Sequence, residues 1–200
     1  MQSRQFNDRT EWKLNDVVFH RLKETLLNPE IDLFASRLNF QVKPFMSWGH
    51  DPEAYAVDAF EHNWSKWLIY AFPPFSLIQR VLMQWRRDRA DGMLIVPLWP
   101  TAVWFPQLLR LLVQEPVILP KGKRLLTLPH SNAAHPLQRK LRLLACVLSG
   151  NLSRHEAFME RLKASSVLHG EVQPRNNMPV ILRDGDPFVL NGQVIPCVPL

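Results

Sequence analysis

Two carboxylates and a double-proline turn are the groups in this chain best placed to do chemistry. Asp32 and Asp58 each lie in a short apolar run, and the apolar run 68–72 leads directly into the turn Phe72-Pro73-Pro74-Phe75. A carboxylate at a strand end can accept hydrogen bonds from ribose hydroxyls, and a Pro-Pro turn leaves rigid carbonyls free because its nitrogens cannot donate. If the three runs are neighbouring parallel strands, these groups meet at one sheet edge, where nucleotide-like cofactors commonly bind.

Each of these residues also has a structural explanation. Asp32 can brace the turn at Ser36 to Asn39, because aspartate often bonds to nearby backbone, and the same explanation applies to Asp58. Phe72 and Phe75 can be core aromatics, in which case the two prolines simply end the strand. The residues alone leave both explanations open.

A basic cluster and one tryptophan are the candidates for contact with nucleic acid. Arg86, Arg87 and Arg89 lie near the end of a predicted helix, where cations suit either the helix dipole or a phosphate. Trp48, like Trp12, falls outside the apolar patterns that make the other tryptophans packing residues. The net charge of +6 favours an acidic partner, with DNA or another nucleic acid the commonest candidate.

Composition limits the class of protein further. The 200 residues are 46% hydrophobic, which suits one globular domain with a tail or arm, and 17 prolines exclude long coiled coils. No apolar run approaches the ~20 residues that span a bilayer, and two cysteines do not make a disulfide framework, so we expect the cytoplasm or nucleus. His130 and His135 lack a third ligand at short spacing, so no metal site is expected.

Apolar runs alternate with helical patterns along most of the chain. We predict a helix capped by Asn15 and ended by Pro29, a helix from Ser76 to Arg89 closed by Gly92, one beginning at Thr101, and a last one over 136–148. Predicted strands cover 31–36, 57–60, 68–72 and 93–96, with a hairpin joining 117–119 to 125–128. The alternation predicts an α/β fold with a mostly parallel sheet covered by helices on both faces.

The ends of the chain differ from its middle. Residues 1–10 are predicted to form an arm, 11–150 the α/β domain, and 151–200 a largely irregular linker or tail with an amphipathic segment over 153–163. Asn191-Gly192 lies between β-prone runs, which predicts a small hairpin there.

Five runs together carry a resemblance to a known family: Glu11–Leu14, Glu30–Asn39, Asp58–Phe60 with Trp64, Tyr70–Ser76, and Ile95–Pro100 with Trp104-Phe105. They resemble phage-type, Dam-like DNA N6-adenine methyltransferases. They resemble more closely the methyltransferase-like segment of DIRS-type retrotransposon polyproteins, which lies between ribonuclease H and a tyrosine recombinase. The resemblance covers about 11–150; Ser3-Arg4 is similar to the end of a ribonuclease H segment, and the residues from Leu148 on are similar to the linker before the recombinase.

The resemblance implies a Rossmann-like methyltransferase fold, S-adenosylmethionine as cofactor and DNA as substrate. It places the catalytic loop at Phe72-Pro73-Pro74-Phe75 and the cofactor contacts at Asp32, Phe34, Ala35, Ser36 and Asp58. Active members carry Asn or Asp directly before Pro-Pro, whereas this chain has Phe72, which has no polar atom to orient an amine. Ala35 and Ser36 stand where such cofactor folds usually have glycine, although phage-type relatives also use small residues there.

Three hypotheses follow for the function. The first is a catalytically degenerate methyltransferase-like domain of a retrotransposon polyprotein that handles nucleic acid. The second is an active adenine methyltransferase that receives a flipped base at the Pro-Pro turn. The third is a non-catalytic nucleic-acid-binding module whose affinity depends on salt.

Overall fold

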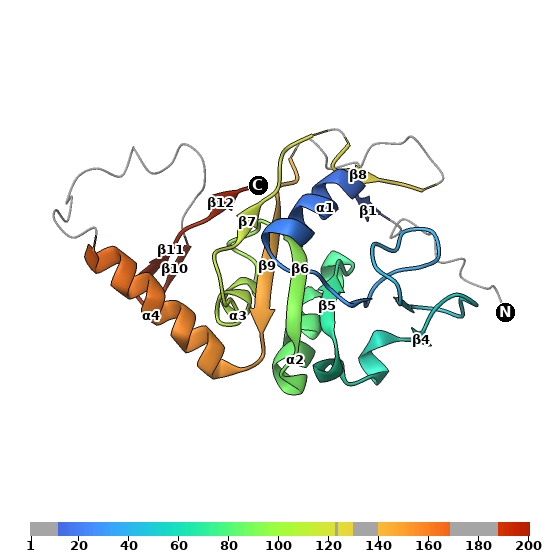
Figure 1. Cartoon of the computed structure of the whole chain (residues 1–200), viewed down its shortest axis with the longest axis horizontal. Coiled ribbons are helices and arrows are strands. Elements are labelled where there is room, and N and C mark those ends of the chain that lie inside the picture. Colours follow the sequence, from blue (N-terminus) through green and yellow to red (C-terminus); the bar gives the residue numbers. More distant parts are fainter. Residues whose placement is uncertain (1–11, 123, 130–139, 169–187) are drawn as a thin grey trace.

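A computed structural model describes residues 12–122, 124–129, 140–168 and 188–200, and its centre is a six-stranded sheet (Figure 1). The strand order is β12-β7-β9-β6-β5-β2. Strands β2, β5 and β6 are parallel, β9 is antiparallel to its neighbours β6 and β7, and β12 is parallel to β7. The fold is therefore mixed α/β with a mostly parallel sheet, formed by β2 (Ile31–Asp32), β5 (Leu68–Ala71), β6 (Asp91–Pro97), β7 (Val117–Ile118), β9 (Leu143–Ser149) and β12 (Val198–Pro199).

Two short strands extend the sheet beyond β2. The strands β3 (Met46–Ser47) and β4 (Ala56–Val57) pair in parallel, and Asp32 forms a parallel bridge with Phe45. The Asp32 and Ala35 amides donate to the carbonyls of Pro44 and Met46, both at 3.1 Å. After β2 the chain thus runs outward to β3 and β4, and then returns to β5 on the other side of β2.

Among the described residues, four helices accompany the sheet: α1 (Asp16–Thr25), α2 (Ile78–Asp88), α3 (Phe105–Leu109) and α4 (Leu152–Leu168). The predicted Asn15 cap is confirmed, because its side chain accepts hydrogen bonds from the Val17 and Val18 amides. Short 3-10 turns cover Ala59–Glu61, Trp64–Lys66 and Phe75–Leu77. No helix in these described ranges is both long and apolar enough to span a membrane.

Alternate strand residues contribute to two separate core clusters. Tyr70, Met93, Ile95, Leu143 and Ala145 pack in one cluster with Phe19 and Leu22 of α1. Their neighbours along the same strands, among them Ile69, Leu94 and Cys146, pack in the other cluster with buried residues of α2 and α3. This alternation is the period-2 pattern of strands that are buried on both sides.

The prediction that 68–72 and 93–96 pair as strands is confirmed, with Tyr70 opposite Met93 in a parallel register. The predicted helix over 136–148 is wrong in its described part, since β9 forms there and pairs with β6 over seven residue pairs. All seven residues of β9 are buried. A continuous apolar run does not distinguish a buried strand from a buried helix, which is why the pattern misled.

The predicted hairpin between 117–119 and 125–128 is also wrong. Strand β7 pairs with β9 and β12, while β8 (Leu126–Thr127) pairs with β1 (Lys13–Leu14) near the start of the described chain. Both runs therefore pair with strands that are distant in the sequence, and the turn between them does not decide their pairing.

Several predicted boundaries move. Ser76 is exposed and caps no helix, because the 3-10 turn Phe75–Leu77 precedes α2, and α2 ends at Arg89 in the left-handed conformation (φ 53°). Gly92 lies within β6, not at a helix end. The helix expected from Thr101 shrinks to α3, whose start is set by Pro106.

Two further predicted strands change in part. The predicted strand 31–36 forms only over its first two residues. The predicted strand 57–60 divides into the end of β4 and a 3-10 turn, because Asp58 (φ 51°) caps that turn.

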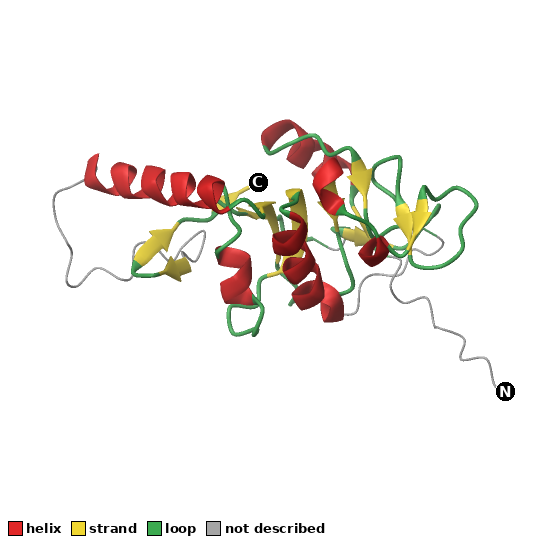
Figure 2. Cartoon of the chain, turned by 90° about the horizontal axis from the view of Figure 1, so that it is seen from below, coloured by secondary structure: helices red, strands yellow, loops and turns green. Residues whose placement is uncertain are grey.

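The prediction that 151–200 form a largely irregular linker or tail is wrong for the described residues after 150, which contribute to the same core and sheet. The predicted segment 153–163 lies within α4, and the predicted hairpin forms as β10 (Phe188–Leu190) and β11 (Gln193–Ile195) with Asn191-Gly192 at its turn. Figure 2 shows α4 and this hairpin at the same end of the molecule. Strand β12 then becomes the edge of the main sheet, where the Val198 and Leu200 amides donate to carbonyls of Pro116 and Ile118 at 3.0 and 3.1 Å.

Candidate functional site

The structure brings the predicted catalytic loop, the predicted cofactor residues and Trp48 to one side of the sheet. We call this side the carboxyl edge, meaning the segments that directly follow β2, β3, β4, β5 and β6. Phe34, Ala35 and Ser36 follow β2, Trp48 follows β3, Asp58 follows β4, and the Pro-Pro turn follows β5. The predicted convergence of Asp32 with the turn is therefore confirmed, since Asp32 lies beside Tyr70 in the register of β2 and β5.

The arginine cluster lies elsewhere. Arg86, Arg87 and Arg89 are at the C-terminal end of α2, which leads into the first residue of β6 and so lies at the opposite edge of the sheet. Arg87 is paired with its neighbour, Nε to Asp88 Oδ1 at 2.9 Å. These three residues do not share a site with the Pro-Pro turn.

Asp32 braces its own loop. It is 2% exposed, and its two carboxylate oxygens accept hydrogen bonds from the Phe34 amide at 3.3 Å and the Gln41 amide at 3.0 Å. Burial raises the pKa of Asp32 from 3.8 to about 7, against the opposing effect of these two hydrogen bonds and of the Lys13 charge. The local structural explanation for Asp32 thus holds, and both oxygens are engaged before any ligand arrives.

The loop after β2 is closed by further hydrogen bonds. The Ser36 amide and hydroxyl both donate to Asn39 Oδ1, at 2.7 and 3.1 Å. Phe34 turns its ring toward Phe60 and Trp64, with ring centroids 5.5 and 6.2 Å away. The segment that the resemblance assigns to cofactor therefore folds onto itself and onto the neighbouring aromatic core.

The double-proline turn carries an aromatic row. The centroids of Phe72 and Phe75 are 6.3 Å apart, and Phe75 makes an edge-to-face contact with Trp99 at 5.3 Å. The Pro74 carbonyl accepts the Leu77 amide at 2.9 Å, so this carbonyl is not free as the sequence suggested. The position before the two prolines thus holds a half-buried phenyl ring that packs against the core cluster of α1.

Asp58 likewise has a local function. Its side chain accepts a hydrogen bond from the Phe60 amide at 3.0 Å, and its own amide donates to the Ser47 carbonyl at 2.8 Å. Trp48, by contrast, is 61% exposed, which confirms it as one of the freer tryptophans.

Two residues of this region escaped the sequence analysis. Tyr70 is buried with its ring 4.8 Å from Phe19, and its hydroxyl has no hydrogen-bond partner among the described residues. Burial and the nearby Asp32 charge raise the Tyr70 pKa above its usual value. Trp99 was expected to be a packing residue, yet it remains 39% exposed beside Phe75. A tyrosine within an otherwise apolar run was the one available signal for the first.

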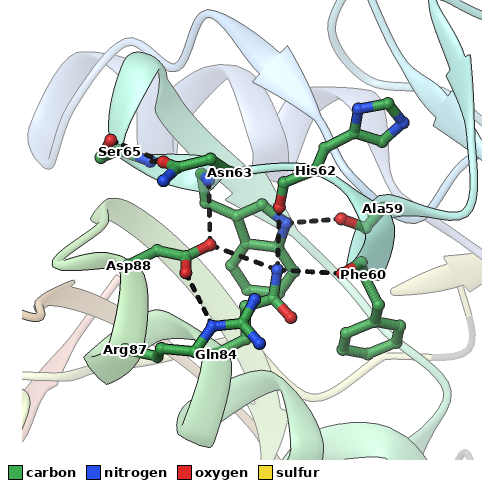
Figure 3. Close-up of polar contacts among 9 residues, drawn as sticks. Ala59, Phe60, His62, Asn63, Ser65, Gln84, Arg87 and Asp88 are labelled. Carbon is green, nitrogen blue, oxygen red and sulfur yellow. Dashed lines mark hydrogen bonds and ion pairs between the residues drawn. The ribbon is translucent and has the colours of Figure 1, made fainter.

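A buried polar network joins α2 to the segment 59–66 (Figure 3). The Gln84 side chain, 5% exposed, donates to the carbonyl of His62 at 2.9 Å and to Asp88 Oδ2 at 3.2 Å. Asp88 Oδ2 also accepts the Trp64 amide at 3.1 Å. Helix α2 is thereby joined to the segment 59–66, against which Phe34 packs.

We expect Gln84→Leu to destabilise the protein by about 1–3 kcal/mol, because the carbonyls of Phe60 and His62 lose their side-chain donor and Asp88 Oδ2 keeps only the Trp64 amide. The free energy of unfolding from urea titration measures the loss. Met83→Ala is the matched control, since Met83 is on the same helix and 61% exposed, and its change should stay within about 0.5 kcal/mol. Equal stability of both variants would show that the network does not stabilise this region.

A groove of about 510 Å³ lies away from the carboxyl edge. It is bounded by the end of α1, by α4 and by β12, with Leu26, Arg161 and Val198 among its lining residues. Within 12–122, 124–129, 140–168 and 188–200, no three His, Cys, Asp or Glu side chains lie together as a metal ion would require. His130 and His135 lie outside these ranges.

Comparisons with known proteins give no match: no protein-family model matches the chain, and no curated protein matches it.

Proposed function

We propose that this chain is a methyltransferase-like domain of a retrotransposon polyprotein that has lost methyl transfer and handles nucleic acid. The observation that carries the proposal is Phe72, an apolar ring placed directly after β5 and packed on Phe75. Active members of the family that the chain resembles have a polar side chain at this position, which holds the amino group of a flipped base.

The order of the strands supports a Rossmann-like architecture. The spatial order of these strands is β4-β3-β2-β5-β6. The chain forms β2 first, then adds β3 and β4 on one side of it, and then adds β5 and β6 on the other side. This is the central feature of doubly wound sheets, in which the ligand crevice lies at the carboxyl ends where the direction reverses. That point falls between β2 and β5, next to Asp32 and the Pro-Pro turn. The two alternating core clusters, one with α1 and one with α2 and α3, support helices on both faces.

The chemistry argues against methyl transfer. A phenyl group can neither accept a hydrogen bond from an exocyclic amine nor stabilise charge that develops on it, and loss of one such preorganised group typically lowers rates about 10²–10³-fold. The residues that the resemblance assigns to the cofactor also argue against activity, because Asp32 and Ser36 are hydrogen-bonded within their own loop. Binding of S-adenosylmethionine would have to replace these contacts.

Calorimetric titration with S-adenosylmethionine, together with a methylation assay on adenine-containing DNA, tests the proposal. We expect no binding at millimolar cofactor and no methylation by the wild type. A matched variant, Phe72→Asn, supplies the missing amide without changing the loop after β2, and it should also remain inactive because the cofactor site is altered independently. Micromolar binding with methylation by the wild type would overturn the proposal and establish an active adenine methyltransferase.

The proposed neighbours are a ribonuclease H domain before this segment and a tyrosine recombinase after it. The similarity of Ser3-Arg4 to the end of a ribonuclease H segment supports this context on the N-terminal side. Reading frames for reverse transcriptase and recombinase on the two sides of the coding sequence would test it directly.

A further inference from the structure

We infer that the carboxyl edge binds single-stranded nucleic acid by stacking bases on Trp48 and Trp99. The inference rests on the proposed function, for which it names the partner and the residues. From sequence alone, Trp99 is predicted to be a packing residue, and the arginines of α2 are candidates for either the helix dipole or a phosphate.

Trp99 is a supported and accessible ring. It follows β6 by two residues, its amide donates to the Pro97 carbonyl at 2.9 Å, and its carbonyl accepts the Ala102 amide at 2.9 Å. Phe75 contacts the Trp99 ring edge-to-face at an interplanar angle of 79°, which fixes the orientation of the indole. Trp99 nevertheless stays 39% exposed. A large aromatic ring held in place in this way loses little side-chain freedom when a base stacks on it.

Trp48 is the second ring on the same edge. It follows β3 directly, is 61% exposed, and lies in a short segment where the Ser47 hydroxyl bonds to the Gly49 carbonyl at 2.6 Å. The strand order β3-β2-β5-β6 puts three strand spacings, about 14 Å, between the two segments that carry the tryptophans. The segment with Phe72 and Phe75 follows β5, which lies between β2 and β6 in the strand order, and Phe75 contacts Trp99.

Two exposed arginines on the same edge can meet the phosphates. Arg37 lies in the loop after β2, where its amide donates to Asp51 Oδ2 at 2.9 Å. Arg80 lies in the first turn of α2, which follows the Pro-Pro turn and the 3-10 turn Phe75–Leu77, and its guanidinium carbon is 3.8 Å from the centroid of the Phe60 ring. Cations beside aromatic rings are the combination by which proteins hold single strands.

The geometry favours single strands over duplex. Stacking requires bases whose faces are open, which a duplex does not offer, and the two tryptophans lie on short segments at a sheet edge and not on a helix that could enter a groove. A second copy of the chain is the competing occupant for exposed indoles, and the experiment below separates the two.

Fluorescence anisotropy with a labelled single-stranded oligothymidine and a duplex of equal length tests the inference. We expect the wild type to prefer the single strand, and the double variant Trp48→Ala/Trp99→Ala to bind it at least about 10-fold more weakly, because both stacking rings are removed. Trp99→Phe should retain most of the affinity. Val103→Ala, an 83% exposed residue in the same loop, and Arg86→Gln/Arg89→Gln at the opposite edge should bind like the wild type.

Unchanged affinity of the double tryptophan variant, or tighter binding of duplex, would overturn the inference while leaving the proposed loss of methyl transfer standing. A wild-type dimer that the double variant dissociates, seen by size-exclusion chromatography with light scattering, would assign the tryptophans to self-association instead. The cofactor titration decides the proposed function independently, because none of these substitutions alters Phe72 or the loop after β2.

Discussion

Replacing Gly92 with alanine should remove a large part of the folding stability. Gly92 lies in β6 opposite Ile69 of β5, with φ 156°, and a Cβ atom there would stand 2.2 Å from the Ile69 carbonyl oxygen and 2.7 Å from its amide nitrogen. Both atoms belong to backbone in the middle of the sheet, so neither can move without disturbing the pairing that positions the Pro-Pro turn. We expect a loss of roughly 3–5 kcal/mol from overpacking and backbone strain.

Gly49→Ala is the control for this substitution, because nothing lies within 4 Å of a Cβ at that position. Its effect on the free energy of unfolding should stay within about 0.5 kcal/mol. Urea titration of both variants at one pH measures the contrast. If Gly92→Ala unfolds at the same urea concentration as Gly49→Ala, the close approach of β5 and β6 at this residue is incorrect.

Stability should also fall as the pH rises from about 4 to 7, through Asp32. The folded protein keeps the Asp32 proton up to a pKa of about 7, whereas the unfolded chain releases it near 3.8. Between these values the folded state binds more protons, so raising the pH favours unfolding by up to ~1.4 kcal/mol per pH unit, and the effect levels off above pH 7. The contribution of Asp32 is therefore largest in acid.

Asp32→Asn isolates this effect, because asparagine keeps an oxygen acceptor and does not titrate. The free energy of unfolding of the wild type, minus that of the variant, should decrease between pH 4 and 7. Other carboxylates, such as Asp51 with its pKa lowered by the Arg37 and Glu53 amides, are common to both proteins and cancel in the difference. Parallel pH profiles of the two proteins would contradict the assignment.

The parts of the fold that sequence predicted well are those with strong local signals. Asn15 caps a helix because its side chain can reach two amides, and the run before the prolines ends as a strand because proline cannot extend it. Strand β9 was missed because residues 143–149 are buried on every side, which erases the period that distinguishes a strand from a helix. Its neighbours in the sheet, β6 and β7, lie far away in the chain, and no local rule identifies them.

The candidate site shows the same division. The meeting of Asp32 with the Pro-Pro turn followed from the assumption of parallel strands, which β2 and β5 satisfy. The use of the Asp32 oxygens did not follow, because one of their donors, the Gln41 amide, comes from nine residues further along the loop. The exposure of Trp99 could not be predicted either, because it depends on the path of the loop after β6, which places the indole against Phe75. An apolar sequence pattern does not determine that path.

The edge strand β12 has a consequence for association between molecules. Val198 and Leu200 direct their amides inward to β7, and between them Pro199 has no amide proton to offer to the outside. An approaching strand would therefore find an interrupted row of donors, which is a common protection against the growth of sheets between chains. Residues 198–200 therefore both complete the described sheet and leave its outer edge without a continuous row of donors.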